Sequence, residues 1–379
     1  MTPHLPAVWR ERNPSTNLRV VQAAGNRPPR MHRLRHAFRL GLGLLIAVTI
    51  GQAGRAVAGD LSTELAAGGL VLDKTDSVSM EREDLTISPT EIRVRYRMRN
   101  DTGRPVQLRV AFPMPEVPKA TPAGLSTATS HNIIMPPIAG PNFLGFRVWA
   151  DGREITPEVE MRATLPDGRD VTDPVRRIGG ASLLLHTGTF EQEAAPALPG
   201  TEGSRGLDPV ARGKLEALGA LEQDENVYEL RWTTRITLHW MQVFDPGVTV
   251  LEFRYRPVVG THSFEVKPDT PLNRHEKQRY CIDPPTERAI RSTSRRGDLT
   301  AYTLGYVLQT ANTWRGPIGT FHLTLQGDQV ATVNGRPAKV RMMSLCTDLP
   351  LRQTGPMRFE ATMSDYVPAY DLLLLVLAD

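Results

Sequence analysis

The sequence has no apolar run long enough to cross a membrane as a helix. Its two longest runs extend from Leu40 to Ile50 and from Leu372 to Leu377, whereas a spanning helix needs about 20 predominantly apolar residues. Signatures of familiar enzymes are also missing: there is no G-x-S-x-G elbow, no S-x-x-K set and no glycine-rich phosphate loop. No repeat of about 20 to 50 residues is visible, which argues against propellers and solenoids. No enzyme class is therefore favoured by a motif.

Cysteine is scarce. The chain of 379 residues has two cysteines, Cys281 and Cys346, which lie far apart in the sequence. In an oxidising compartment such a pair predicts one disulfide, which is worth roughly 4 kcal/mol by loop-closure entropy. The alternative is two separate buried thiols. A catalytic cysteine is not favoured, because no neighbour of either residue suggests an activated thiol.

Histidines are few and dispersed, so the sequence predicts no metal site and no cofactor. Six histidines follow residue 58, and no spacing pairs them as ligands: His131, His186, His239, His262, His275 and His322. His275-Glu276 begins like a zinc-protease helix, but Arg279 occupies the position of the second histidine ligand.

Positive charge is concentrated at the start of the chain, although the net charge is only +4. Of the 45 basic and 41 acidic residues, nine arginines and one acid lie in residues 1–58, which leaves 36 basic and 40 acidic residues beyond them. Nucleic-acid binding depends on clustered Lys and Arg that neutralise phosphates. A mildly acidic remainder therefore argues against nucleic acid as a partner.

Residues 31–58 have the pattern of a secretory signal peptide. A basic start precedes the apolar run, and small residues end in an A-x-A pattern at Ala56–Ala58. We expect cleavage after Ala58, a location in the periplasm or cell envelope, and no transmembrane segment in the mature chain; the short run disfavours an uncleaved anchor. Residues 1–30 are polar and aperiodic, so we expect a disordered upstream extension with Met31 as the true start, the alternative being an ordered extension.

Alternation of apolar and polar residues predicts many short strands from Asp76 onward. Residues 92–99 and 106–112 alternate on either side of a turn and predict an antiparallel hairpin, and residues 232–243 and 249–256 predict a second pair. Further tight turns are predicted by Asp-Gly and Asn-Gly dipeptides that begin at Asp151, Asp167 and Asn334. The apolar run at the C-terminus predicts a buried strand.

We therefore predict a mainly β protein with two β-sandwich-like units and one or two short helices, with a distorted barrel as the alternative architecture. The N-terminal β unit comprises residues 59–260, with a mobile insertion at about 187–206 and a short helix at about 209–221. Residues 261–379 form the C-terminal β unit, with a second short helix from near Pro284.

Four segments carry a resemblance to a known family. They are ELAAGGLVLDKTDSVSMEREDLTISPTEIRVRYRMRN at residues 64–100, AFPMPEV at 111–117, YRPVVG at 255–260 and GYVLQTANTWRGPIGTFHLTL at 305–325. In order and wording they resemble the exported bacterial proteins grouped as domain of unknown function 4424, over nearly all of residues 59–379. The resemblance implies a periplasmic or cell-envelope setting. It implies no activity, cofactor or catalytic residue.

An arginine stripe is the most concrete surface feature of the sequence. Arg93, Arg95, Arg97 and Arg99 share one face of a predicted strand, about 7 Å apart. The stripe could bind an acidic polysaccharide, a lipid headgroup or a protein. The alternative is cross-strand pairing with acids such as Glu81 and Glu83. Trp314 lies among turn residues, so we expect it to be partly exposed and a second candidate for binding.

The leading functional hypothesis is a non-enzymatic binding or assembly module of the periplasm or cell envelope. It follows from an exported β-rich chain that lacks catalytic motifs. The alternative is a hydrolase of envelope glycans or peptides that uses paired carboxylates, such as Asp365 and Asp371. The catalytic residues of such an enzyme are not defined by the sequence.

Overall fold

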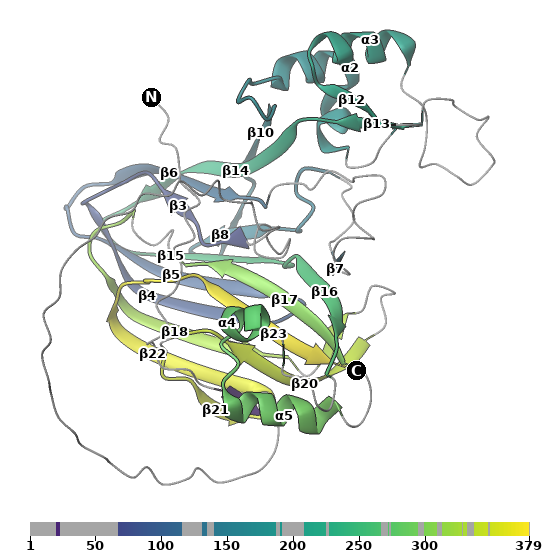
Figure 1. Ribbon diagram of the computed structural model, residues 1–379. Helices are drawn as coiled ribbons and strands as arrows, with labels where there is room; N and C mark the ends of the chain where they lie inside the picture. Colours follow the sequence, from purple (N-terminus) through teal and green to yellow (C-terminus); the bar gives the residue numbers. More distant parts are fainter. Residues whose placement is uncertain are drawn as a thin grey trace, which may run out of the picture.

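The computed structural model describes residues 20–22, 67–115, 131–134, 140–186, 190–191, 208–224, 227–266, 272, 274–294, 299–308, 313–327, 329–331, 337–347 and 349–378. These residues form mostly strands and four short helices (Figure 1). The prediction of a mainly β fold is confirmed, although we expected one or two short helices and the described residues form four. Within the described part of the chain, no helix is both long enough and apolar enough to span a bilayer.

The front sheet has eight strands. Its order is β21-β22-β18-β4-β5-β15-β8-β9, antiparallel except for the pair β18 and β4. The strands are β21 (Arg352–Gly355), β22 (Arg358–Tyr366), β18 (Ile318–Gln326), β4 (Val78–Ile87), β5 (Ile92–Asn100), β15 (Gly247–Tyr255), β8 (Arg147–Ala150) and β9 (Arg153–Ile155). The predicted turn at Asp151 is confirmed, since it joins the paired strands β8 and β9.

The back sheet follows the order β1-β20-β23-β17-β16-β7, with β19 beside β20 and β2 beside β17. The strands are β1 (Val20–Gln22), β20 (Pro337–Leu345), β23 (Leu372–Ala378), β17 (Leu299–Val307), β16 (Val259–Phe264), β7 (His131–Ile134), β19 (Gln329–Ala331) and β2 (Ala67–Gly68). The C-terminal run forms β23 in the interior of this sheet and is buried throughout, as predicted. Alternate residues of β23 contact two different cores, which explains its unbroken apolar sequence.

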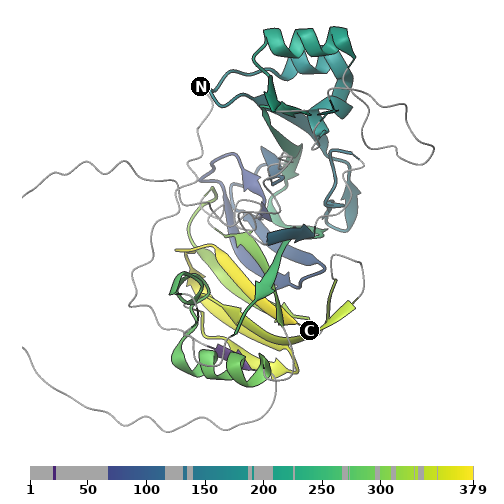
Figure 2. The ribbon, with the colours of Figure 1, turned by 45° about the vertical axis from the view of Figure 1, so that its right-hand side comes forward.

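The side sheet has the order β10-β14-β6-β3, and the small lobe sheet has the order β11-β13-β12. The side sheet comprises β10 (Glu158–Thr164), β14 (Thr233–Phe244), β6 (Val106–Pro113) and β3 (Val71–Leu72), and the lobe sheet comprises β11 (Phe190–Glu191), β13 (Val227–Leu230) and β12 (Leu221–Asp224). The strands β10 and β14 extend from the three large sheets to a lobe, and this lobe stands apart from those sheets in both views (Figures 1 and 2).

Two helices belong to the lobe and two lie by the back sheet (Figure 1). The lobe contains α2 (Thr172–Leu185) and α3 (Pro209–Ala217), and the others are α4 (Arg274–Arg279) and α5 (Pro284–Ser294). The predicted helix α3 begins as expected, because the Asp208 carboxylate accepts the Ala211 N–H at 3.0 Å. It is shorter than predicted, since Leu221 already belongs to β12.

One core fills the space between the front sheet and the other two large sheets. Apolar residues of all three sheets share it, and Phe112 of the side sheet stacks on Phe146 beside β8 at 4.2 Å between ring centroids. The lobe has a separate core around the buried Trp232. A third core lies between α5 and the outer face of the back sheet, with Ile290 fully buried.

The strands of both predicted hairpins exist, but their pairing was wrong. β5 pairs with β4 and β15, whereas β6 pairs with β14 and β3. The connection from β5 to β6 therefore crosses between facing sheets, and so does the connection from β14 to β15. The Asn100 side chain joins the two crossings, because its Nδ2 donates to the Arg104 and Phe244 carbonyls at 2.8 Å. Alternation alone does not distinguish such a crossing from a hairpin.

The predicted boundary near residue 260 does not separate the sheets. β18, which lies beyond it, pairs along six residues with β4, which lies before it. The front sheet thus combines strands from both predicted units into one layer. Of the predicted extension, the structure describes only β1, which pairs with β20. Three predictions concern residues outside the described ones: nearly all of the insertion expected at 187–206, the signal peptide expected at 31–58 and the turn expected at Asn334.

Candidate functional site

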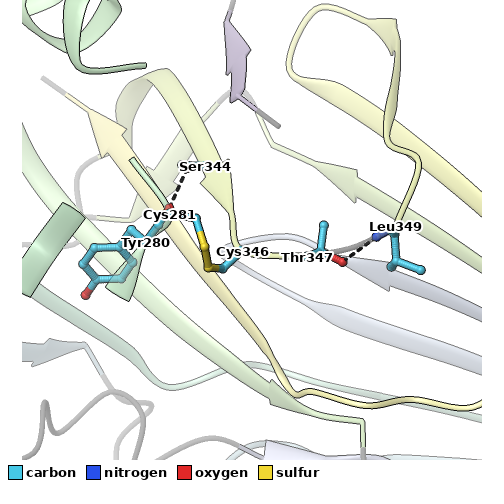
Figure 3. Close-up of a disulfide and its surroundings, with 6 residues drawn as sticks. All are labelled: Tyr280, Cys281, Ser344, Cys346, Thr347 and Leu349. Carbon is cyan, nitrogen blue, oxygen red and sulfur yellow. Dashed lines mark hydrogen bonds between the residues drawn. A yellow bond between two sulfur atoms is a disulfide. The ribbon is translucent and has the colours of Figure 1, made fainter. Parts of the chain in front are cut away.

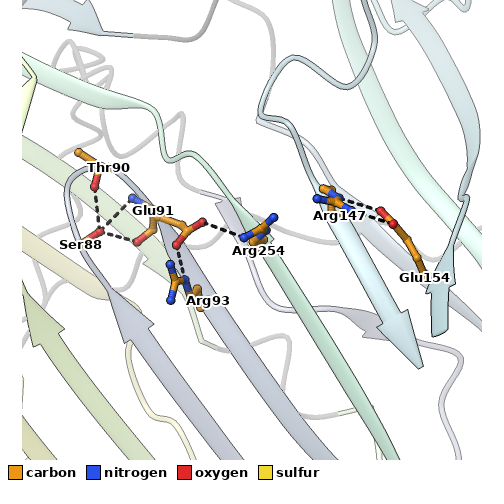
Figure 4. A network of polar contacts seen from close by, with 7 residues as sticks. All are labelled: Ser88, Thr90, Glu91, Arg93, Arg147, Glu154 and Arg254. Atoms are coloured by element: carbon orange, nitrogen blue, oxygen red, sulfur yellow. Dashed lines mark hydrogen bonds and ion pairs between the residues drawn. The ribbon is translucent and has the colours of Figure 1, made fainter. Parts of the chain in front are cut away.

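The arginine stripe is paired with acids along the outer face of the front sheet. Arg95 Nε lies 2.8 Å from Glu252 Oε1, and Arg97 Nη2 lies 3.5 Å from Glu81 Oε2. Arg99 also pairs with Glu81, and Arg93 pairs with Glu91, which lies near Arg254 as well (Figure 4). The four guanidinium groups therefore do not form an uncompensated cationic surface.

The same ion-pair pattern continues across the neighbouring strands. Arg147 and Glu154 form a bidentate ion pair between β8 and β9 (Figure 4). Arg147 Nε donates to Glu154 Oε1 at 2.7 Å, and Nη2 donates to Oε2 at 2.8 Å. The Arg147 guanidinium holds the pKa of Glu154 below its ordinary value. The guanidinium groups of Arg147 and Arg254 lie over Trp149, 5.0 and 5.5 Å from its ring centroid. This face is a neutralised sheet surface.

Glu83 lies in the core, although the sequence suggested it as a surface partner of the arginines. A β-bulge between Met80 and Arg82 shifts the register of β4 against β5. The bulge adds one residue, so the side chains after it change faces. Glu83 consequently lies inside, opposite Tyr96, with 2% of its surface exposed.

The buried Glu83 lies near two buried tyrosines, Tyr96 and Tyr306. Burial, and then the charge of Asp84, raise the pKa of Glu83 to about 8. Burial also raises the pKa of Tyr96 and Tyr306, and Glu83 adds to both shifts. The raised pKa of Glu83 is thus a consequence of its burial in the core. Glu83 lines neither of two surface grooves that the described residues form.

Trp314 is buried, which corrects the prediction of partial exposure. It is 6% exposed and packs against Tyr96 at 6.2 Å between ring centroids. The strand bridge between Ser79 and Arg315 fixes its backbone beside β4. Because its ring forms part of the main core, Trp314 offers no platform to a ligand.

The two carboxylates of the hydrolase hypothesis do not form a pair: one is exposed and the other is hydrogen-bonded to the backbone. Asp365 is exposed near the end of β22, and Asp371 accepts the Leu308 N–H at 2.8 Å. Asp167 and Asp170 pair with Arg169 and Arg162, and hydrogen bonds from their neighbours lower the pKa of both acids. A catalytic acid needs the opposite shift. No group of three or more potential metal ligands occurs among the described residues.

Cys281 and Cys346 form a disulfide (Figure 3). Their Cα atoms lie 5.2 Å apart, and the bond connects the segment between α4 and α5 with the end of β20. The neighbouring Tyr280 carbonyl accepts a hydrogen bond from Ser344 Oγ at 3.0 Å. The disulfide therefore fixes the helical segment to the back sheet.

A groove of about 710 Å³ lies between β10 and the start of α2. It is lined by Val159, Glu160, Met161, Arg162, Asp170, Thr172, Asp173, Pro174, Arg176, Arg177 and His239. A second groove of about 530 Å³ lies between β8–β9 and β14 and is lined by Ala150, Asp151, Arg153, Ile155, Trp240, Met241 and Gln242. The first groove is the larger of the two and contains most of the charged side chains.

Most charges of the first groove are paired within it or at its rim. Arg162 lies 3.1 Å from Asp170, and Arg176 lies 3.2 Å from Asp173. Glu160 pairs with Arg109 of β6 at 2.9 Å. Arg177 differs from these, because its Nε donates to the Asp173 carbonyl at 3.3 Å and no acid among the described residues pairs with it. Arg177 is thus a cationic side chain of the groove for which the described residues supply no acidic partner.

The family model of "Domain of unknown function (DUF4424)" matches residues 58–375. The chain belongs to this family. No curated protein matches it. The crystal structure of a "putative nutrient binding protein" from Legionella pneumophila subsp. pneumophila strain Philadelphia 1 is similar at a TM-score of 0.36 and 12% identity, over 82% of this chain and 70% of that chain. A likeness at this level says nothing about what this chain binds.

In this member of the DUF4424 family, the groove is a feature that sequence reasoning missed. Its residues come from β10, the segment before α2, α2 itself and one position of β14. One signal was available: Pro157 and Pro166 flank the alternating segment that forms β10, and prolines at both ends are typical of a strand at the edge of a sheet. The sequence did not indicate that α2 would lie beside this edge, because Gly179 and Gly180 obscure its helical pattern.

Proposed function

We propose that this DUF4424 protein is exported to the periplasm or cell envelope and binds a partner protein in the groove between β10 and α2 without catalysing a reaction. The groove is the observation that carries this proposal, because it combines open space with the positive charge of Arg177, which no acid among the described residues pairs with. The sequence of residues 31–58 and the disulfide support export.

An envelope protein is the partner that these features favour over an anionic polymer. Polymer binding would need a row of uncompensated cations, whereas the acids Glu81, Glu91 and Glu252 neutralise the arginine stripe. The groove instead offers mixed charges and the apolar Val159, which is 44% exposed. Such a combination is typical of protein interfaces.

Site-specific photo-crosslinking in the native cell tests the proposal. A benzoylphenylalanine at Val159 should form an adduct with an envelope protein, and Arg177→Glu should weaken that adduct. The matched control is the same probe at Val367, which is 61% exposed but far along the chain in the connection after β22. Equal adducts from both positions, or none from Val159, would contradict binding in the groove. Turnover of an envelope substrate that Asp365→Asn or Asp371→Asn abolishes would contradict a non-catalytic role.

A further inference from the structure

The outer edge of β10 carries a β-ladder that is only partly filled. β10 is the last strand of the side sheet and pairs with β14 along its full length on its inner edge. On its outer edge, residues 169–172 form the beginning of another ladder. The Ala163 carbonyl accepts the Val171 N–H at 2.9 Å, and the Ala163 N–H donates to Thr172 Oγ1 at 2.8 Å. Helix α2 begins at Thr172, so this segment turns away from the strand.

The backbone of Val159 and Met161 continues that outer edge. In a strand, the N–H and C=O of one residue point to the same edge, and every second residue repeats this direction. Since both groups of Ala163 point outward, those of Met161 and Val159 do as well. The opposite strand agrees: the Ile236 carbonyl accepts the Met114 N–H from β6, so Ile236, which lies opposite Met161, faces away from β10.

The groove lies along this open stretch of backbone. Four consecutive residues of β10, Val159 to Arg162, line it. Successive side chains of a strand point to opposite faces, so a groove on one face would meet only alternate residues. A groove lined by consecutive residues therefore includes the edge, and it also reaches over the sheet as far as His239 of β14. Among the described residues, no hydrogen-bond partner lies on this side of Val159 or Met161.

We infer that the groove binds an extended, acidic peptide segment of a partner protein, which adds to β10 as a further strand of the side sheet. This inference rests on the proposed function and specifies its ligand. The peptide would continue the ladder from the point where residues 169–171 leave it. An apolar residue would cover Val159, and an acidic residue would pair with Arg177, for whose guanidinium the described part of the chain provides no acid.

Unfilled edges are normally protected against such pairing by prolines and charges. Pro157 and Pro166 limit the open edge of β10 at both ends. Between them, the charged side chains of Glu160 and Arg162 are held by Arg109 and Asp170. The edge is therefore short enough to resist aggregation and open enough for one extended segment.

The test uses peptides that bind the full chain, selected from a phage-displayed library of random eight-residue segments. The selected peptides, made with a fluorescein label and measured by anisotropy, should contain an acid and alternate apolar with polar residues. Met161→Pro removes an outward N–H without touching the bonds to β14, so binding should weaken by about tenfold or more. Met161→Leu keeps the N–H and should bind within about threefold of the wild type.

Hydrogen exchange of the wild-type chain provides a test that does not depend on a variant folding. Without peptide, the amides of Val159 and Met161 should exchange faster than those of Glu160 and Arg162, which point to β14. With peptide bound, the first pair should become protected. Slow exchange of Val159 and Met161 in the free chain, or no protection with peptide, would overturn strand addition.

The outcomes also separate this inference from the proposed function. If Arg177→Gln abolishes peptide binding while Met161→Pro and the amide exchange have no effect, the groove binds through side chains and strand addition is wrong. If the library returns no peptide and Val159 forms no adduct in cells, both the inference and the proposed function fail.

Discussion

At the scale of single residues, Glu83 is the most informative position. Its carboxyl is buried because one bulge in β4 changes the face of every following side chain. The apolar residues record that change: Val78 and Met80 are buried before the bulge, and Leu85 and Ile87 after it. This shift from even to odd positions was visible in the sequence, and it would have placed Glu83 inside.

Glu83 should make folding less stable as the pH rises. Below about pH 4.5 the carboxyl is protonated in both the folded and the unfolded chain. Between pH 4.5 and about 8, the unfolded chain releases the proton while the folded chain keeps it, so the free energy of unfolding falls. The loss at pH 7 is on the order of 3 kcal/mol. Urea unfolding of the wild type and of Glu83→Gln should show this slope in the wild type alone.

Glu81→Gln is the matched control for this experiment. Its side chain lies two positions away on the outer face, where it pairs with Arg97 and Arg99. The slope between pH 5 and 8 should persist in this variant. A slope that persists in Glu83→Gln would show that another group is responsible.

The arginine stripe should matter little for stability or binding. Arg95→Ser and Arg97→Ser each remove an ion pair between partly solvent-accessible side chains. Such pairs contribute about 0–1 kcal/mol, so the two variants should unfold within about 1 kcal/mol of the wild type. Envelope association in cell fractions should keep its salt dependence. If a variant that combines Arg95→Ser and Arg97→Ser lost its envelope association, the stripe would be a binding surface after all.

At the scale of elements, the sequence predicted where strands occur better than which strands pair. Alternation located β5, β6, β14 and β15, because each strand buries one face. It could not tell a hairpin from a crossing between facing sheets, since both bury alternate residues. The groove was unpredictable for a similar reason: its walls come from β10 and α2, and only the tertiary structure brings them together.

Gly319 should be essential for the contact between β18 and the bulge of β4. A Cβ atom at this position would lie 2.8 Å from the Glu81 carbonyl oxygen, which belongs to the backbone. Gly319→Ala should therefore destabilise the fold by about 1–3 kcal/mol. Gly213 is the control, because it lies in α3 with no neighbour within 4 Å of such a Cβ. Gly213→Ala should stabilise the chain by up to about 1 kcal/mol in thermal unfolding. Equal effects of both changes would contradict the tight contact.

At the scale of the whole molecule, the cores and the disulfide hold together segments that are distant in sequence. The bond between Cys281 and Cys346 joins positions with a sequence separation of 65. The variant with both cysteines changed to serine should lose about 4 kcal/mol of stability. The comparison is the wild type after reduction, which should show the same loss. Equal unfolding of the wild type before and after reduction would contradict a stabilising disulfide.

The last prediction concerns export, on which the proposed function depends. Removal of residues 31–58 takes away four arginines and no acid, so a precursor that begins at Met31 should be close to neutral and the mature chain should carry a net negative charge. Intact mass and isoelectric focusing of the protein from the native cell should therefore show a chain that begins at Gly59 with an acidic isoelectric point. Ala58→Asp disrupts the A-x-A pattern and should cause the uncleaved precursor to accumulate, because the cleavage site needs a small residue. Thr63→Asp adds the same charge beyond the site and should be processed normally. A wild-type chain that still carries its signal sequence in the envelope would contradict export with cleavage at this site, and the envelope partner would lose its support.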